Sequence, residues 1–252
     1  MASTLHPLTS LTAAGCTAVI TTAAGLWPLS LAVAFAAAVL AWRAGVGRRV
    51  LAAAAAVLLP LGLSLLMLHG LFFPEGRTVL AALGPARVTV EGLAFALEAG
   101  TRTGACVLVL LLFSFTVSAP DLVAALAARG LPPQVGFVLA SALTLLPAMA
   151  GRIEAIRAAQ EARGLVVGGS VLSRLAAVRV QMVPLVLGLI EESGSRAQAL
   201  DARGFGSPGP RTAYRELADP PVQRRLRAAL LLLAAVAVAL RLGTSWPAAG
   251  LP

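Results

Sequence analysis

The first 42 residues carry no charged side chain, because Lys, Arg, Asp and Glu are all absent from Met1 to Trp42. That length and apolarity fit one membrane span or two tightly paired short ones. The chain as a whole is also apolar, since 58% of its 252 residues are hydrophobic, 12% are charged and the mean hydropathy is +0.87. Ordinary soluble domains are far more polar. We therefore expect an all-α membrane protein, and expect its N-terminal stretch, which lacks a basic signal region, to be retained in the membrane.

Breaks in the apolar sequence divide it into helices. Gly25 to Pro28 interrupts the first block, which favours a helical hairpin. The clearest single span is residues 50–73, which would be about 36 Å long at 1.5 Å per residue and contains Pro60 as an expected kink. About five transmembrane helices are expected, at residues 8–24, 27–42, 50–73, 88–118 and in the apolar run 228–240 of the last segment.

Arginine accounts for all 20 basic residues, and against 11 acids it leaves a formal charge of +9. Nucleic-acid binding would require those charges on a water-soluble face, whereas here they flank apolar runs. Positive-inside topology and contact with anionic lipid explain most of them. The rule places the loop with Arg43, Arg48 and Arg49 in the cytoplasm, the loop with Glu75, Arg77 and Arg87 outside, and residues 119–227 in the cytoplasm of an inner-membrane protein.

A new domain is predicted to begin at Ser118-Ala119-Pro120-Asp121, where a capping serine, an early proline and an aspartate announce a helix that Gly130 ends. Residues 119–221 are richer in charge than the rest. We therefore divide the chain into four transmembrane helices in residues 1–118, a cytoplasmic domain in residues 119–221 and the last transmembrane helix in residues 222–252.

Two long helices dominate that middle domain and share one plan. Each has an apolar first half with a proline, Pro147 or Pro184, and then a charged half that ends in Arg-Gly. The shared plan indicates an internal duplication. The apolar runs 135–150 and 180–190 are shorter than the roughly 20 residues of a span, so we expect these amphiphilic helices to lie crossed at the membrane surface. The two prolines are candidate hinges, and static curvature is a slightly less favoured alternative.

The two helix ends repeat one phrase, Glu161-Ala162-Arg163-Gly164 and Asp201-Ala202-Arg203-Gly204. An arginine followed by glycine is first of all a helix stop, and Ala128-Arg129-Gly130 is a third instance without the preceding acid. The matched pair on two long helices is more informative. Guanidinium groups pair bidentately with carboxylates or carbonyl grooves, and small neighbours let such a groove approach closely. The pair predicts two contacts with a two-part soluble partner.

These motifs, with the Ser118-Ala119-Pro120 corner, Arg129-Gly130-Leu131-Pro132 and Gly204-Phe205-Gly206, resemble the transmembrane coupling subunit, or T component, of energy-coupling-factor transporters. The resemblance covers roughly residues 88–245, and the first 87 match as generic spans. It implies that Arg163 engages one of two ABC ATPases and Arg203 the other, with the adjacent Ala and Gly lining the contact. It also implies a small substrate-binding membrane subunit against the apolar helix faces, for vitamin or transition-metal uptake.

Other functions find less support in the residues. There is no phosphate loop and no lysine, so ATP and Mg²⁺ are expected in the partner ATPases, and no cofactor in this chain. An intramembrane enzyme would require a cluster of titratable groups, whereas Glu98 with Arg102 is one ion pair for which a structural role is favoured. Cys16, Cys106 and the two histidines are dispersed and predict no metal site. A membrane scaffold or lipid-surface protein without a transport role is the alternative.

Overall fold

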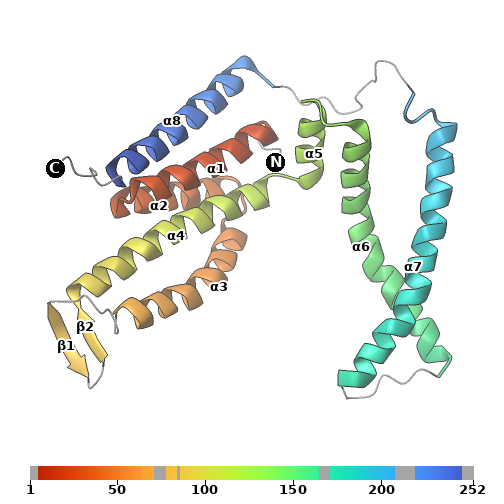
Figure 1. Cartoon of the computed structure of the whole chain (residues 1–252), viewed down its shortest axis with the longest axis horizontal. Coiled ribbons are helices and arrows are strands. Elements are labelled where there is room, and N and C mark those ends of the chain that lie inside the picture. Colours follow the sequence, from red (N-terminus) through yellow and green to blue (C-terminus); the bar gives the residue numbers. More distant parts are fainter. Residues whose placement is uncertain (1–4, 71–77, 84–85, 165–170, 208–218, 246–252) are drawn as a thin grey trace, which may run out of the picture. The chain divides into compact units, whose positions relative to one another are not determined.

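The computed structural model describes residues 5–70, 78–83, 86–164, 171–207 and 219–245. These residues are mostly helical (Figure 1). They divide into two compact units, Met1–Ala125 with Leu217–Pro252, here called the bundle, and Leu126–Glu216, here called the crossed unit. The division predicted from the sequence, at residues 118/119 and 221/222, stays a prediction. The elements in chain order are α1 (Pro7–Ala24), α2 (Trp27–Arg43), α3 (Gly47–Leu65), the π-helical turn η1 (Leu66–Gly70), β1 (Val79–Leu83), β2 (Ala86–Thr89), α4 (Val90–Thr116), α5 (Ala119–Ala127), α6 (Pro133–Ala162), α7 (Val171–Ala202) and α8 (Pro221–Ser245).

The charge-free N-terminal stretch folds as two helices, as the sequence predicts. Gly25 ends α1 with φ +64°, a conformation that favours glycine, and Pro28 lies in the first turn of α2. α1 packs against α8 and α4, and α2 packs against α4 and α3. Small side chains are prominent in the buried interior, since Ala41 and Ala105 are fully buried, as is Val50. Small residues allow membrane helices to approach closely.

The predicted span at residues 50–73 is helical from Gly47, contains Pro60, and changes to a π-helical turn before Gly70. Residues 71–77, with Glu75 and Arg77, lie outside the described residues. The loop expectation for the following segment is wrong, because β1 and β2 pair there as an antiparallel hairpin. β-branched residues such as Val79, Val88 and Thr89 favour strands. The Thr78 hydroxyl donates to the Glu91 carboxylate at 2.7 Å, which joins the hairpin to the start of α4.

Arg227 is buried at the start of α8. Its side chain binds Asp219 at 2.7 and 2.8 Å and donates to the Thr9 hydroxyl at 3.3 Å. The Gln223 side-chain oxygen accepts from the His6 backbone at 2.8 Å and from Thr9 at 3.1 Å. This polar cluster connects the first and last helices of the bundle at one end.

The crossed unit consists chiefly of α6 and α7, which run in opposite directions and cross (Figure 1). Both helices change direction part-way along their length in this view, and each contains the predicted proline, Pro147 or Pro184. Proline is the usual physical cause of such a bend. Residues 165–170, which include the predicted linker 165–169, and residues 208–218 lie outside the described residues.

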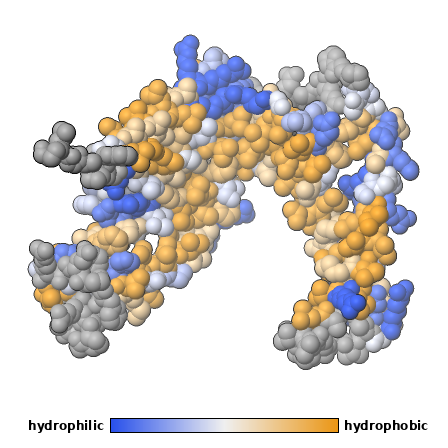
Figure 2. Space-filling model, in the orientation of Figure 1, coloured by the Kyte–Doolittle hydropathy of each residue, from blue (hydrophilic) through white to orange (hydrophobic). Residues whose placement is uncertain are grey.

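The exposed surface of both units is largely hydrophobic (Figure 2). In the part of the chain that the structure describes, four helices are long and apolar enough to cross a membrane: 47–70, 90–116, 133–162 and 221–243. The chain is an all-α membrane protein with one small hairpin. The predicted count of five spans is not reproduced by this criterion, which omits α1 and α2 and includes α6. Because α6 is 30 residues long, the shortness of its apolar run 135–150 no longer excludes a span, and its surface position stays a prediction.

Candidate functional site: two arginine helix ends

The first predicted motif forms the end of α6. The Arg163 backbone N–H donates to the Gln160 carbonyl at 3.1 Å, and the Gly164 N–H donates to the Glu161 carbonyl at 3.0 Å. Gly164 has φ +90°, in the left-handed region where an L side chain is strained. A Cβ there would meet no atom within 4 Å, so the backbone conformation alone requires glycine.

The second motif has the same backbone hydrogen bonds at the end of α7. Arg203 donates to Leu200 at 3.1 Å and Gly204 donates to Asp201 at 2.9 Å. Gly204 has φ +71°, and a Cβ there would also lie 3.3 Å from the Ser207 hydroxyl. The sequence duplication is therefore also a duplication of local structure.

Ala128-Arg129-Gly130 adopts this geometry too, with Arg129 and Gly130 donating to Leu126 and Ala127 and with φ +99° at Gly130. The backbone therefore identifies Ala-Arg-Gly as a helix end in all three cases. The matched pair differs from the third instance in the length of the helix that each motif ends, because α6 has 30 residues and α7 has 32, whereas α5 has 9.

Arg163 and Arg203 are both exposed. Within the described part of the chain, neither guanidinium group has an ion pair or a hydrogen bond. A guanidinium group presents five N–H donors in a rigid planar fork, so each end offers a complete donor set to another molecule. Ala162 and Ala202 beside them are also exposed, which leaves room for a close approach.

The two acids of the repeated phrase have different surroundings. Glu161 accepts from the Arg157 guanidinium at 2.8 Å, one helical turn earlier. Asp201 has no such pair, because Ala197 occupies the position one turn before it. The acid shared by the two motifs is thus a helix-stabilising group at the first end and an exposed carboxylate at the second.

Two contacts that the sequence analysis missed determine where the ends lie relative to each other. Arg152 of α6 forms an ion pair with Glu192 of α7, which also accepts from Arg196 at 2.6 and 3.0 Å. The Phe205 ring, just after the second motif, lies 5.3 Å from the Phe137 ring near the start of α6. Arg203 is therefore close to the start of α6, and Arg163 is at its end. A straight helix from residue 137 to residue 163 would be about 39 Å long, and α6 contains Pro147, so the two arginines lie on the order of 30–40 Å apart.

The charged groups described in the bundle give less indication of a functional site than the two arginine ends do. Glu98 and Arg102 pair at 2.5 Å as predicted, and a Cβ at Gly25 would lie 3.7 Å from guanidinium nitrogens of both Arg102 and Arg241. This ion pair therefore lies where α4, α8 and the α1–α2 turn meet, which fits a structural role. Among the described residues no group of three or more His, Cys, Asp or Glu is arranged to hold a metal ion.

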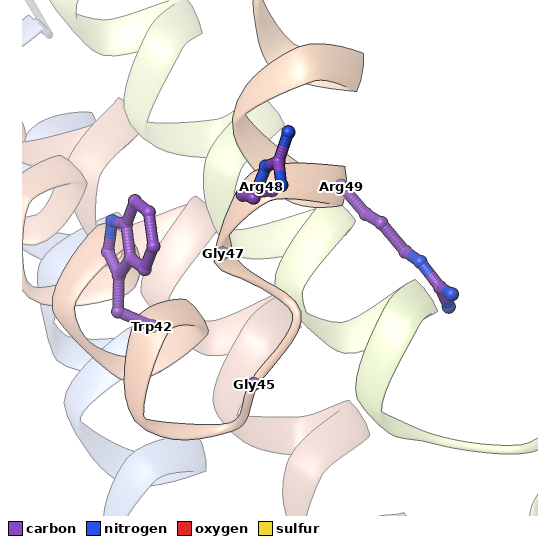
Figure 3. Close-up of a pocket in the computed structure, with 5 residues that line it drawn as sticks. All are labelled: Trp42, Gly45, Gly47, Arg48 and Arg49. Carbon is purple, nitrogen blue, oxygen red and sulfur yellow. The ribbon is translucent and has the colours of Figure 1, made fainter.

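A pocket of about 450 Å³ lies at the turn between α2 and α3, and it is basic (Figure 3). Its lining consists of Trp42, Gly45, Gly47, Arg48 and Arg49. A Cβ at Gly47 would lie 2.6 Å from the Trp42 indole, so this contact requires glycine. Arg49 extends away from Trp42 (Figure 3). The lining residues include no carboxylate, imidazole or thiol, and its arginines match the predicted basic loop.

Comparison with known proteins agrees with the motifs. Residues 1–214 match the family described as CbiQ, cobalt transport protein, so the match includes the first 87 residues, for which the motifs gave no signature. The energy-coupling factor transporter transmembrane protein EcfT of Leuconostoc gelidum is 28% identical over 170 residues, which cover 64% of this chain and 63% of that protein. The EcfT protein of Limosilactobacillus fermentum is 34% identical over 85 residues, or 33% of this chain and 32% of the relative.

A third relative is named differently. A putative ABC transporter ATP-binding protein of Bifidobacterium longum is 30% identical over 191 residues, which cover 71% of this chain but 24% of that protein. The matches thus span less than two thirds of the length of each of these relatives.

Proposed function

The chain belongs to the cobalt transport protein (CbiQ) family, and on that premise we propose that it is the transmembrane coupling subunit, or T component, of an energy-coupling-factor importer in the inner membrane. In this role it couples ATP hydrolysis in two ABC-type ATPase subunits to movement of a separate, small substrate-binding membrane subunit. The observation that carries the proposal is the pair of exposed arginines, Arg163 and Arg203, at matched helix ends on the order of 30–40 Å apart.

Each arginine supplies one contact to one ATPase. A soluble dimer has two equivalent or near-equivalent sockets, and two like groups on one rigid scaffold can occupy both at once. A guanidinium group that becomes buried in a groove lined with carbonyl or carboxylate oxygens gains several charge-assisted hydrogen bonds. The relative named as an ABC transporter ATP-binding protein supports such an association, because a segment like this chain forms part of it.

The apolar surfaces of α6 and α7 face the substrate-binding subunit. Large hydrophobic side chains remain exposed along both helices, among them Val138 (62%), Leu146 (67%), Leu187 (61%) and Ile190 (62%). Such surfaces require lipid or an apolar partner. The transported substrate is a vitamin or a transition-metal ion and is selected by that other subunit. The present chain is not catalytic, and ATP with Mg²⁺ binds to the ATPases.

Affinity purification of the full chain from its native membrane tests the proposal. Two ABC-type ATPase subunits per chain, identified by mass spectrometry, and ATP hydrolysis in the purified sample are the expected result. A chain that purifies with lipid but without a nucleotide-binding protein would contradict it and would favour the membrane-scaffold alternative. Omitting the detergent-exchange step in a parallel sample controls for subunits lost during purification.

A further inference from the structure

The Arg152–Glu192 ion pair joins two positions that are equivalent in the duplicated sequence. Arg152 lies eleven residues before Arg163, and Glu192 lies eleven residues before Arg203. The same offset of 40 residues relates the two Ala-Arg-Gly motifs to each other. Equivalent positions with opposite charge thus meet across the two helices.

This equivalence gives the two arms equal length. Eleven helical residues span about 16 Å, so the ion pair lies midway along the path between the two arginine ends. Because α6 and α7 run in opposite directions, the two arms point away from the pair in opposite senses (Figure 1). A contact at this midpoint, together with the Phe137–Phe205 ring contact, limits how far apart both ends can lie.

Few other described contacts in the crossed unit can set the separation of the two arginine ends. Leu185, at 9% exposed, is the only buried side chain among those described in this unit, and no side chain of α6 is buried. The other ion pairs among the described residues of these helices, Arg157 with Glu161 and Arg196 with Glu192, each stay within one helix. Arg196 instead holds the Glu192 carboxylate in place for Arg152.

We propose that Arg152 and Glu192 are positioning residues that clamp α6 to α7 midway between the two arginine ends and so set the spacing that both ATPases must meet. The functional consequence rests on the proposed coupling role. The clamp itself is a property of this chain and is measured without any ATPase.

The experiment uses the full chain in lipid nanodiscs with Cys16 and Cys106 replaced by alanine. Spin labels at Ala159→Cys and Ala199→Cys report the distance between the arms, since both positions are exposed and each lies four residues before its arginine. Arg152→Gln removes the clamp and leaves Glu192 paired with Arg196. Arg152→Lys keeps the charge. Arg157→Gln removes a more exposed ion pair that lies within α6, and it is the control for loss of an arginine charge on the same helix.

Half-exposed ion pairs shift populations by about two- to five-fold, so in Arg152→Gln the share of distances outside the parent peak should rise by that factor. Arg152→Lys should restore the parent distribution and Arg157→Gln should leave it unchanged. A parent-like distribution in Arg152→Gln, or equal broadening in Arg157→Gln, would overturn the clamp.

Transport per ATP in the reconstituted importer provides the second measurement. It should fall in Arg152→Gln, recover in Arg152→Lys and stay unchanged in Arg157→Gln. Broadened distances with unchanged transport per ATP would overturn the coupling consequence. Failure of the wild-type chain to bind any ATPase would count against the proposed function alone, because the distance measurement does not depend on that binding.

Discussion

The bundle and the crossed unit differ in how many of their described side chains are buried. In the bundle, Ala41, Val50 and Ala105 are fully buried, and even the charged Arg227 is only 7% exposed. In the crossed unit, α6 buries no side chain at all. The bundle is therefore held together by its own helix contacts, whereas the crossed unit is held by a few specific contacts and by whatever covers its apolar faces. On the proposed function, the partner subunits cover the apolar surface that the crossed unit leaves exposed.

The largest expected effect is on the bundle, from removal of Arg227. Arg227→Ala removes the Nη2 nitrogen that contacts both carboxylate oxygens of Asp219, whose side chain is 11% exposed. Breaking a buried ion pair costs about 3–5 kcal/mol, so the thermal unfolding temperature of the purified protein should fall strongly. Arg224→Ala is the control, because Arg224 also binds Asp219 but is 65% exposed, and a surface pair contributes about 0–1 kcal/mol. Equal effects of the two substitutions would contradict the buried cluster.

The next prediction concerns membrane topology, and its outcome decides whether α6 differs from the bundle helices in lying outside the bilayer. If α6 lies at the cytoplasmic surface, cysteines at Gln134 and Arg152 should both react with a reagent added from the cytoplasmic side, in a chain without Cys16 and Cys106. If α6 crosses the membrane, which its 30 residues allow, one of the two should be protected until the outer face is opened. The latter result would move part of the crossed unit into the bilayer.

Smaller effects are expected from the prolines of the crossed unit. If Pro147 and Pro184 are hinges, Pro147→Ala and Pro184→Ala should leave the complex assembled while uptake per ATP falls to roughly half, because proline removes a backbone hydrogen bond and allows bending there. Pro60→Ala in the bundle serves as the comparison, since that helix lies outside the crossed unit. Unchanged uptake per ATP in both variants would leave these prolines a static role.

The smallest effect is the pH dependence of the crossed unit. Hydrogen bonds from Arg152 and then Arg196 lower the pKa of Glu192 below its ordinary 4.5. A carboxyl whose pKa is lower in the folded state stabilises the fold above its unfolded pKa, and this contribution is lost as the pH falls through the folded value. The distance between labels at residues 159 and 199 should therefore be constant from pH 7 to about pH 5 and broaden only below 4.5. Broadening near pH 6 would contradict this assignment.

Local signals predicted most of the helices. Gly25, Ser118 and Gly130 are short-range stops and caps, and their effects are visible in the sequence because they act within one helical turn. The two arginine ends were identified for the same reason. The hairpin of β1 and β2 was missed because its short strands lie beside turn-forming residues, and the position of α6 was argued from its apolar run instead of the whole helix.

Contacts between distant residues were not predicted. Nothing near Arg227 in the sequence indicates His6 or Thr9, and Phe137 and Phe205 are single aromatic residues without a pattern. Arg152 and Glu192 are different, because the 40-residue offset of the repeated motifs relates them directly. Comparing charges at equivalent positions of the duplication would have suggested that pair, whereas the other contacts depend on how the helices pack.

Retention of the ATPases tests the central claim most directly. Arg163→Ala with Arg203→Ala is compared with Arg129→Ala, which alters the same backbone motif at the end of a short helix, and each chain is purified from membranes that contain equal amounts of it. Truncating a buried interfacial arginine typically costs about 2–5 kcal/mol, so the double variant should retain at least tens-fold less ATPase while Arg129→Ala retains the wild-type amount. Wild-type stoichiometry of ATPase in the double variant would show that the two arginine ends do not hold it.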